Sequence, residues 1–168
     1  MVKITPLHDA DPSVVEALLD DAFGADRRGR TAYRMREGTQ AIDPLCFGAF
    51  EGDRLVGTIQ CWPVSLLTPL GAQPMVMVGP VAVEPDRQRD GIGRALVAAS
   101  LAASDARGGD VLMMIGDPEY YGRFFGFSAD GTALWEVPGP VERRRLLARA
   151  PDGIVMSAVG RIAPRVHA

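Results

Sequence analysis

The sequence predicts a single-domain α/β protein, in which an antiparallel meander is followed by a parallel strand–helix–strand crossover in one mixed sheet. Residues 75–83 form an apolar run, and a glycine-containing turn and a long apolar-faced segment follow it. A second apolar run covers residues 111–115, and two β-like runs precede the first one at residues 45–64. Strands that alternate with helical patterns indicate such crossovers. No internal repeat or interdomain linker interrupts residues 1–168, so we expect one domain.

The N-terminal third predicts a strand and two helical pieces. Residues Lys3–Pro6 form a short first strand. A helix follows, for which Asp11 or Ser13 is the N-cap. A weaker helical piece covers Thr31–Glu37 and ends at Gly38, because glycine commonly terminates helices.

Two strands come next, at Leu45–Phe50 and Arg54–Val64. They are joined across Glu51, Gly52 and Asp53, a typical hairpin signal. We expect residues 65–74 to be a loop that leads to the apolar strand.

The apolar strand has apolar residues of both parities, which predicts burial on both of its faces. Pro85 closes the strand, since proline cannot continue a ladder. The helix begins at about Gly91, with one face formed by Ile92, Leu96, Ala99 and Ala103. Gly108 and Gly109 end it, and the strand Val111–Ile115 follows.

The turn between this strand and helix is the first candidate site. Glycines at a helix start let backbone N–H groups approach an anion at the positive end of the helix dipole. A dinucleotide fingerprint needs a third glycine where Leu96 stands, and a P-loop needs Gly-Lys-Ser/Thr, which is missing. Gln88, Gly91 and Gly93 match a third pattern, Gln/Arg-x-x-Gly-x-Gly/Ala. A helix start that binds no ligand is the alternative.

The second candidate site is the aromatic stretch 117–127. Asp117 as N-cap and Pro118 at the first helical position predict a helix start. The helix is expected to be short, bracketed by Gly122 and Gly126. Its two tyrosines are either core residues, whose hydroxyls satisfy buried backbone groups, or part of a reaction site.

Composition excludes several classes of protein. The net charge is −3, whereas nucleic-acid-binding proteins are normally basic. No apolar run approaches the length of about 18 residues that a membrane-spanning helix needs, and the N-terminus turns polar at once. Cys46 and Cys61 are expected to be buried thiols rather than a bridge or metal site. We therefore expect a cytoplasmic protein without a metal.

The turn, with VAVEP before it and RALVAASL after it, resembles the acetyl-CoA-binding motif of the GNAT N-acetyltransferases. YYGRFFGF resembles the tyrosine-bearing short helix after the fifth strand of that family. The resemblance covers about residues 2–150. Within the family, the chain is similar to a bacterial YhbS-like subgroup, on the basis of the blocks AFGADRRGRTAYRMREG, GTIQCWPV, VGPVAVEPDRQRDGIGRAL, GDPEYYGRFFGF and VPGPVERRRLLA. The subgroup usually has YYxRFGF, so this chain carries one extra phenylalanine.

The resemblance implies how acetyl-CoA binds. Pantetheine would pair with the strand edge at Val81, Ala82 and Val83, where an N–H near Val81 or Val83 would hold the oxyanion. The pyrophosphate would lie on the amides of Gln88, Arg89, Asp90, Gly91, Ile92, Gly93 and Arg94. Arg87, Arg89 and Arg94 would add positive charge. A tyrosine would protonate the leaving thiolate, with Tyr121 the first choice and Tyr120 the second.

The general base is not identified by the resemblance. Some family members carry a glutamate in the middle of the fourth strand, where this chain has Met77. Glu84, Asp43, Glu37 and Glu119 are the other candidates, and a chain of water molecules is an alternative to all of them.

The sequence therefore predicts an acetyl-CoA-dependent N-acetyltransferase that transfers acetyl directly to a primary amine. The alternative is an acyl-CoA-binding sensor or interaction module that has lost catalysis. A dinucleotide oxidoreductase is a third reading. The expected partner is a small-molecule or peptide amine, with no nucleic acid or membrane, and a homodimer is left open. Tyr33 and Arg34 have two interpretations: they line a substrate opening, or they are simply exposed to solvent.

Overall fold

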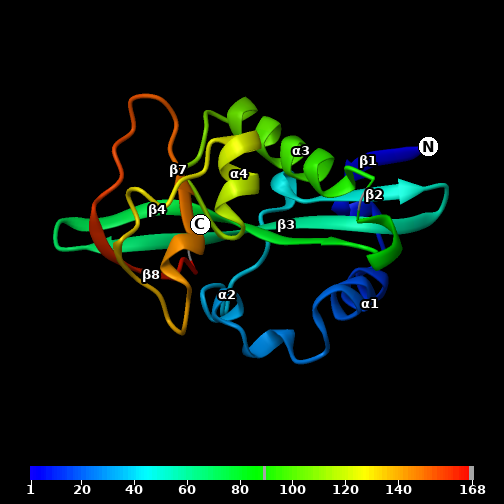
Figure 1. The fold of residues 1–168 in the computed structure, drawn as a ribbon, viewed down its shortest axis with the longest axis horizontal. Helices are drawn as coiled ribbons and strands as arrows, with labels where there is room; N and C mark the ends of the chain where they lie inside the picture. The colour runs from blue at the N-terminus through cyan, green and yellow to red at the C-terminus, as the bar shows by residue number, and fades with distance from the viewer. Residues whose placement is uncertain (89, 167–168) are drawn as a thin grey trace. The chain divides into compact units, whose positions relative to one another are not determined.

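The computed structural model describes residues 1–88 and 90–166 and shows an α/β fold on an open mixed sheet (Figure 1). The hydrogen-bonded strand order is β1-β2-β3-β4-β5-β7, and β8 pairs with β3 and β6. The elements are β1 Val2–Pro6, α1 Pro12–Phe23, α2 Thr31–Arg34, β2 Phe47–Glu51, β3 Arg54–Thr68, β4 Gly71–Val83, α3 Ile92–Ala106, β5 Leu112–Ile115, α4 Pro118–Phe125, β6 Leu134–Glu136, β7 Leu146–Arg149 and β8 Val159–Pro164.

The chain divides into two compact units, and β3 and β4 each contribute residues to both. Unit 1 comprises Met1–Arg28, Ala41–Cys61 and Gly79–Gly108. Unit 2 comprises Gly29–Gln40, Trp62–Val78 and the chain from Gly109 onward. The expectation of a single domain stays a prediction.

Unit 1 packs α1 and α3 on opposite sides of its strands (Figure 1). Asp11, rather than Ser13, caps α1, because its carboxylate accepts a hydrogen bond of 2.9 Å from the backbone N–H of Ser13. The core around α1 consists of Leu7, Val15, Leu18, Leu19, Cys46, Leu55 and Ala82. The predicted hairpin is confirmed, since β2 and β3 pair antiparallel up to Glu51 and Arg54.

Helix α3 begins one residue after the predicted start, and its buried face is rotated from the predicted one. Ile92 and Leu96 are buried as expected, but Ala99 and Ala103 are only half-buried. The buried face also includes Ser100, whose hydroxyl donates a 2.7 Å hydrogen bond to the carbonyl of Leu45. Because that bond satisfies its polar group, a serine can occupy the core where the apolar pattern pointed to alanine.

Unit 2 is built around β5, which pairs parallel with β4 and antiparallel with β7. The parallel β4–α3–β5 connection that the sequence predicted is confirmed. The core of this unit consists of Met35, Val64, Leu66, Met75, Met77, Val111, Met113, Trp135, Leu146, Ala148 and Ile162. Trp135 is fully buried, and its indole N–H donates to the carbonyl of Ser157 at 2.8 Å.

The predicted loop at residues 65–74 is wrong. Strand β3 continues to Thr68 and β4 begins at Gly71, so only a tight turn separates them. The hydroxyl of Thr68 donates to the carbonyl of Gly71 at 2.7 Å and thereby closes the turn. Pairing with β8 extends β3, because Val64–Leu67 align with residues 161–164.

Two helix predictions also change. Helix α2 covers Thr31–Arg34 rather than Thr31–Glu37, because hydrogen bonds between residues three apart follow it, up to Glu37. Gly122 lies inside α4 instead of bracketing it, and only Gly126, at φ 73°, ends the helix. A Cβ on Gly122 would lie 3.1 Å from the carbonyl oxygen of Phe127, so close backbone approach explains this glycine.

Candidate functional site

The turn before α3 leaves the start of that helix uncapped. Gly91 is the N-cap residue at φ 75°, a left-handed conformation that favours glycine. No side chain among the described residues caps the helix, and its first internal bond joins the Ala95 N–H to the Gly91 carbonyl. The N–H groups of Ile92 and Gly93 precede that bond. They have no acceptor within the helix and lie at its positive end, where the helix dipole favours an anion.

Gly93 places this helix start beside the end of β4. A Cβ on Gly93 would lie 3.7 Å from Cγ2 of Val83 and 3.9 Å from Cγ1 of Val81, which are ordinary van der Waals contacts. Its φ is not positive either. Neither the packing nor the backbone of the described chain therefore requires a glycine at this helical position.

The predicted cofactor residues that the structure describes gather around this turn in unit 1. Val81 is half-buried, whereas Ala82 and Val83 are buried. The side-chain amide of Gln88 donates to the carbonyl of Val83 at 3.4 Å, which ties the turn to the strand end. Arg89 lies outside the described residues. The role of these residues in binding acetyl-CoA stays a prediction.

Charge around the turn is partly compensated within the protein. The guanidinium of Arg87 contacts Glu51 at 2.9 Å and Asp90 at 2.6 Å. These hydrogen bonds raise the pKa of Arg87 and lower the pKa of Glu51. Arg87, which the sequence suggested as an extra positive charge, therefore serves first to join the turn to the end of β2.

In unit 2, helix α4 carries the two candidate tyrosines. Asp117 caps the helix by accepting from the Glu119 N–H at 3.0 Å, as predicted. The rings of Tyr120 and Tyr121 meet edge to face, with centroids 4.9 Å apart. A Cβ on Gly116 would lie 2.8 Å from the Tyr121 ring, so this glycine allows the ring to pack against the backbone.

The protonation of Tyr121 follows from this packing. Burial, with a smaller contribution from Tyr120, raises the pKa of Tyr121 to about 12. Its hydroxyl therefore stays protonated near neutral pH and is available as a proton donor. This state suits an acid that protonates a thiolate, and the choice between Tyr120 and Tyr121 stays a prediction.

The carboxylates that the sequence offered as general bases are mostly engaged elsewhere. Glu84 accepts from Arg54 at 2.8 Å and 3.1 Å, Asp43 lies 3.3 Å from His8, and Glu119 pairs with Arg144. Glu37 is exposed. No group of three His, Cys, Asp or Glu residues in the described ranges could hold a metal ion.

At the position where some relatives carry the base, Met77 is 3% exposed and belongs to the core of unit 2. This chain therefore has an apolar packing residue at this position, and the general base is not identified.

Polar side chains inside β3 were missed by the sequence reasoning. The hydroxyl of Thr58 and the amide oxygen of Gln60 are buried without a hydrogen-bond partner among the described residues. Both belong to unit 1 and occupy alternate positions, so they share one face of the strand. The available signal was that Thr58 and Gln60 share one parity and are the only polar residues in the stretch 55–64 of the strand.

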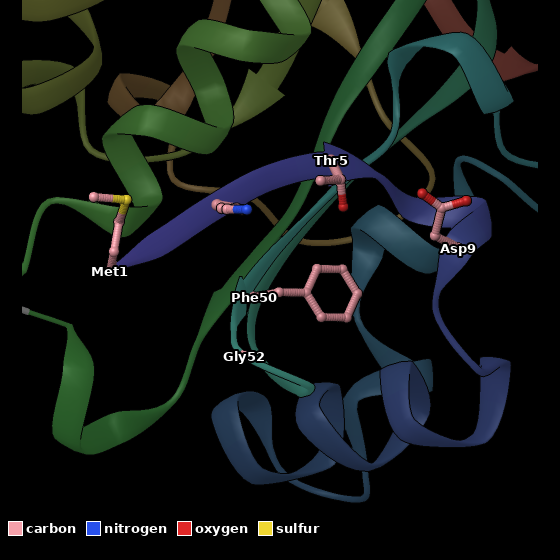
Figure 2. A pocket seen from close by; sticks show the side chains of 6 residues that line it. Met1, Thr5, Asp9, Phe50 and Gly52 are labelled. Atoms are coloured by element: carbon pink, nitrogen blue, oxygen red, sulfur yellow. The ribbon is translucent and has the colours of Figure 1, made fainter.

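A hollow of about 320 Å³ lies at β1 and the end of β2 (Figure 2). Its lining residues are Met1, Lys3, Thr5, Asp9, Phe50 and Gly52. None of these lining residues is among the catalytic or cofactor-binding residues predicted from the sequence. Lys3 and Asp9, its two charged residues, are exposed, and we assign it no role in catalysis.

Comparison with protein families decides the identity of the domain. The family model for the acetyltransferase (GNAT) domain matches residues 3–129. The chain belongs to the GNAT family. Acetyl-CoA is the co-substrate of this family's N-acetyltransferases, so the resemblance inferred from the sequence is confirmed together with the fold class.

Solved structures agree with this fold. A GNAT family acetyltransferase from Brucella melitensis, crystallised with acetyl-CoA, is 22% identical to this chain and superposes with a TM-score of 0.71. The match covers 98% of this chain and 96% of the Brucella chain. YhbS from Escherichia coli, crystallised with CoA, is 21% identical to this chain with a TM-score of 0.72. That match covers 98% of this chain and 89% of the YhbS chain. A search of curated proteins found no match. No helix in the described ranges is long and apolar enough to cross a membrane.

Proposed function

We propose that the protein transfers the acetyl group of acetyl-CoA directly to a primary amine of a small molecule or peptide. The observation that carries this proposal is the uncapped start of α3, where Gly93 lies against Val81 and Val83 at the end of β4. In the GNAT family these two elements hold the pyrophosphate and pantetheine, and here they adjoin within unit 1.

The residues present fit acetyl-CoA. The N–H groups of Ile92 and Gly93 suit the pyrophosphate, because helix N-termini bind anions. Pro80 has no N–H, so the donors available to pantetheine on this part of β4 begin at Val81. Ala82 and Val83 complete the strand segment on which we expect pantetheine to pair.

The chemistry that we assign is direct attack. The neutral amine forms a C–N bond to the acetyl carbon, and the C–S bond of the thioester then breaks. The amine loses a proton to a base that is not yet identified, and the sulfur gains a proton. We assign the second transfer to Tyr121, because the family resemblance places a tyrosine of this short helix near the sulfur and its phenol is protonated at neutral pH, with Tyr120 as the second candidate.

A second function, an acyl-CoA-binding sensor without catalysis, is favoured by two observations. Met77 is buried in the core where some relatives carry the basic glutamate, and Glu84, Asp43 and Glu119 all lie in contact with basic side chains. This rival predicts ligand binding without turnover.

A cytoplasmic location is also a proposal. Cys46 and Cys61 are buried thiols without a disulfide, which suits a reducing compartment.

The experiment is a release assay for free thiol over a panel of amines, run alongside calorimetry of acetyl-CoA binding. An acetyltransferase releases CoA only when a suitable amine is present, whereas a sensor binds acetyl-CoA and releases nothing. Gly93→Glu is the matched control, because its charge and side chain occupy the expected pyrophosphate site. Unchanged acetyl-CoA affinity in folded Gly93→Glu would refute the site.

A further inference from the structure

An arginine side chain in unit 2 lies between two aromatic rings. The guanidinium carbon of Arg36 is 3.8 Å from the centroid of the Tyr33 ring and 4.0 Å from that of the Trp62 ring. The rings cover both faces of the planar guanidinium. Hydrogen bonds to further groups must therefore lie in the guanidinium plane, at its edge. All three residues are half-buried, so the cluster reaches solvent.

The backbone that carries Arg36 is fixed to the loop before β7. The hydroxyl of Thr31 donates to the carbonyl of Pro140 at 2.7 Å, and Arg34 donates to the carbonyl of Pro138 at 3.2 Å. A Cβ on Gly139 would lie 2.5 Å from the Thr31 hydroxyl, so the two segments approach closely. Met35, directly before Arg36, is fully buried in the core. Arg36 is therefore presented by a constrained segment.

Trp62 supplies a second donor beside the guanidinium. Its indole N–H is buried and has no hydrogen-bond partner among the described residues. This group can only donate, so an acceptor atom is the one kind of partner that satisfies it. Unsatisfied buried donors are rare in folded proteins and indicate a partner that the chain itself does not provide.

We propose that Tyr33, Arg36 and Trp62 form a carboxylate-binding site. A carboxylate is planar and has two acceptor oxygens, which match the edge of a guanidinium and a neighbouring indole N–H. Its single negative charge also matches the one guanidinium that the two rings hold. This inference rests on the proposed acetyl transfer, because it assigns the carboxylate to the amine acceptor. The acceptor is then an amino acid or a similar amino-carboxylic acid.

The test compares matched acceptors and products with and without the carboxylate. Acetyl transfer is measured to alanine and to alaninamide, whose amide is neutral. Binding is measured separately by calorimetry with N-acetylalanine, N-acetylalaninamide, acetate and inorganic phosphate, in wild-type protein saturated with CoA. The variants are Arg36→Met, Trp62→Phe and, as a charge-matched control, Arg161→Met, because Arg161 is exposed on β8.

We expect alanine to be preferred over alaninamide in kcat/KM, and N-acetylalanine to bind better than its amide. Arg36→Met should lower both the kcat/KM for alanine and the affinity for N-acetylalanine at least tenfold. The corresponding values for the two amides should not change. Trp62→Phe, which keeps a ring but removes the N–H, should weaken them by less, and Arg161→Met should have no effect. Acetate alone should bind weakly at the same residues.

Three results would overturn the proposal. Equal use of alanine and alaninamide, with both insensitive to Arg36→Met, refutes the carboxylate site while acetyl transfer stands. Tighter binding of phosphate than of any carboxylate refutes the assignment of the ligand. No binding of any anion at millimolar concentration refutes the site altogether. Arg36-dependent binding of N-acetylalanine without acetylation of any amine supports the site and refutes the proposed function.

Discussion

Replacing Gly93 with alanine separates the stability of the fold from binding of acetyl-CoA. Gly93 lies in the first turn of α3, and a Cβ there meets only ordinary contacts, 3.7 Å from Val83 and 3.9 Å from Val81. Glycine in a helix is less stable than alanine by about 0.5–1 kcal/mol. We therefore expect Gly93→Ala to stabilise the ligand-free protein by about 0.5 kcal/mol, the lower value being appropriate to a first turn.

Binding should change in the opposite direction. If the backbone of Gly93 approaches the pyrophosphate, the added methyl group occupies that space, and we expect at least tenfold weaker affinity. At a concentration of about 100 times the wild-type Kd, acetyl-CoA stabilises the wild type by about 2.7 kcal/mol. A tenfold larger Kd reduces this gain to about 1.4 kcal/mol. Gly93→Ala is therefore more stable to unfolding than the wild type by about 0.5 kcal/mol without ligand, and less stable by about 0.8 kcal/mol with it.

The assay is thermal or chemical unfolding of both proteins with and without acetyl-CoA, supported by calorimetric Kd values. Ala98→Gly is the control, because Ala98 is exposed in the middle of α3. It should cost about 1 kcal/mol of stability and leave the ligand's contribution at about 2.7 kcal/mol. A Gly93→Ala protein that gains as much from acetyl-CoA as the wild type would refute close approach of the ligand to this glycine.

Other expectations concern catalysis, titration, thiols and packing. Tyr121→Phe should lower kcat by about 10²–10⁴-fold at near-normal acetyl-CoA affinity, whereas Tyr120→Phe should affect stability more; exchanged behaviours would assign the acid to Tyr120. Phenolate absorbance should show one step at about pH 12 that Tyr121→Phe lacks. Because the folded pKa is raised, the stability linked to this phenol is complete below about pH 10 and is lost as pH rises through about 12. Cys46, whose pKa burial raises to about 11, and Cys61 should react with thiol reagents only after unfolding; rapid modification of native protein would contradict their burial. Gly139→Ala should destabilise the protein by about 1–3 kcal/mol in urea unfolding, and no loss would show that the loop simply shifts.

Local signals explain what the sequence predicted well. Neighbouring residues specify the apolar strand, the turn with Gly91 and the helix that follows. In the structure the helix begins one residue after its predicted start. The same holds for the caps at Asp11 and Asp117, whose carboxylates accept backbone hydrogen bonds two residues away. Such features need no knowledge of distant parts of the chain.

Long-range pairing explains what was missed. Residues 65–67 contain no strong strand signal, but pairing with β8, about a hundred positions later, extends β3 through them. The strands β6, β7 and β8 were not predicted at all, because each pairs with a strand that is distant in the sequence. Such pairings depend on the assembled sheet rather than on local propensity.

The cluster of Tyr33, Arg36 and Trp62, which we propose as a carboxylate-binding site, was only partly visible in the sequence. Tyr33 and Arg34 were singled out, yet Arg34 binds the carbonyl of Pro138 and contributes to fixing α2. Arg36 is the residue that stacks between rings, and one of those rings comes from Trp62 on β3. A contact between residues 26 positions apart cannot be read from spacing along a helix or a strand.

The most direct test of the central claim is mass spectrometry of an amine panel incubated with isotopically labelled acetyl-CoA and the purified protein. We predict that at least one primary amine gains one labelled acetyl group, with an equal amount of free CoA, and that folded Gly93→Glu produces neither. Tight binding of acetyl-CoA with no labelled amine across amino acids, polyamines, antibiotics and peptide N-termini would contradict catalysis and favour the sensor.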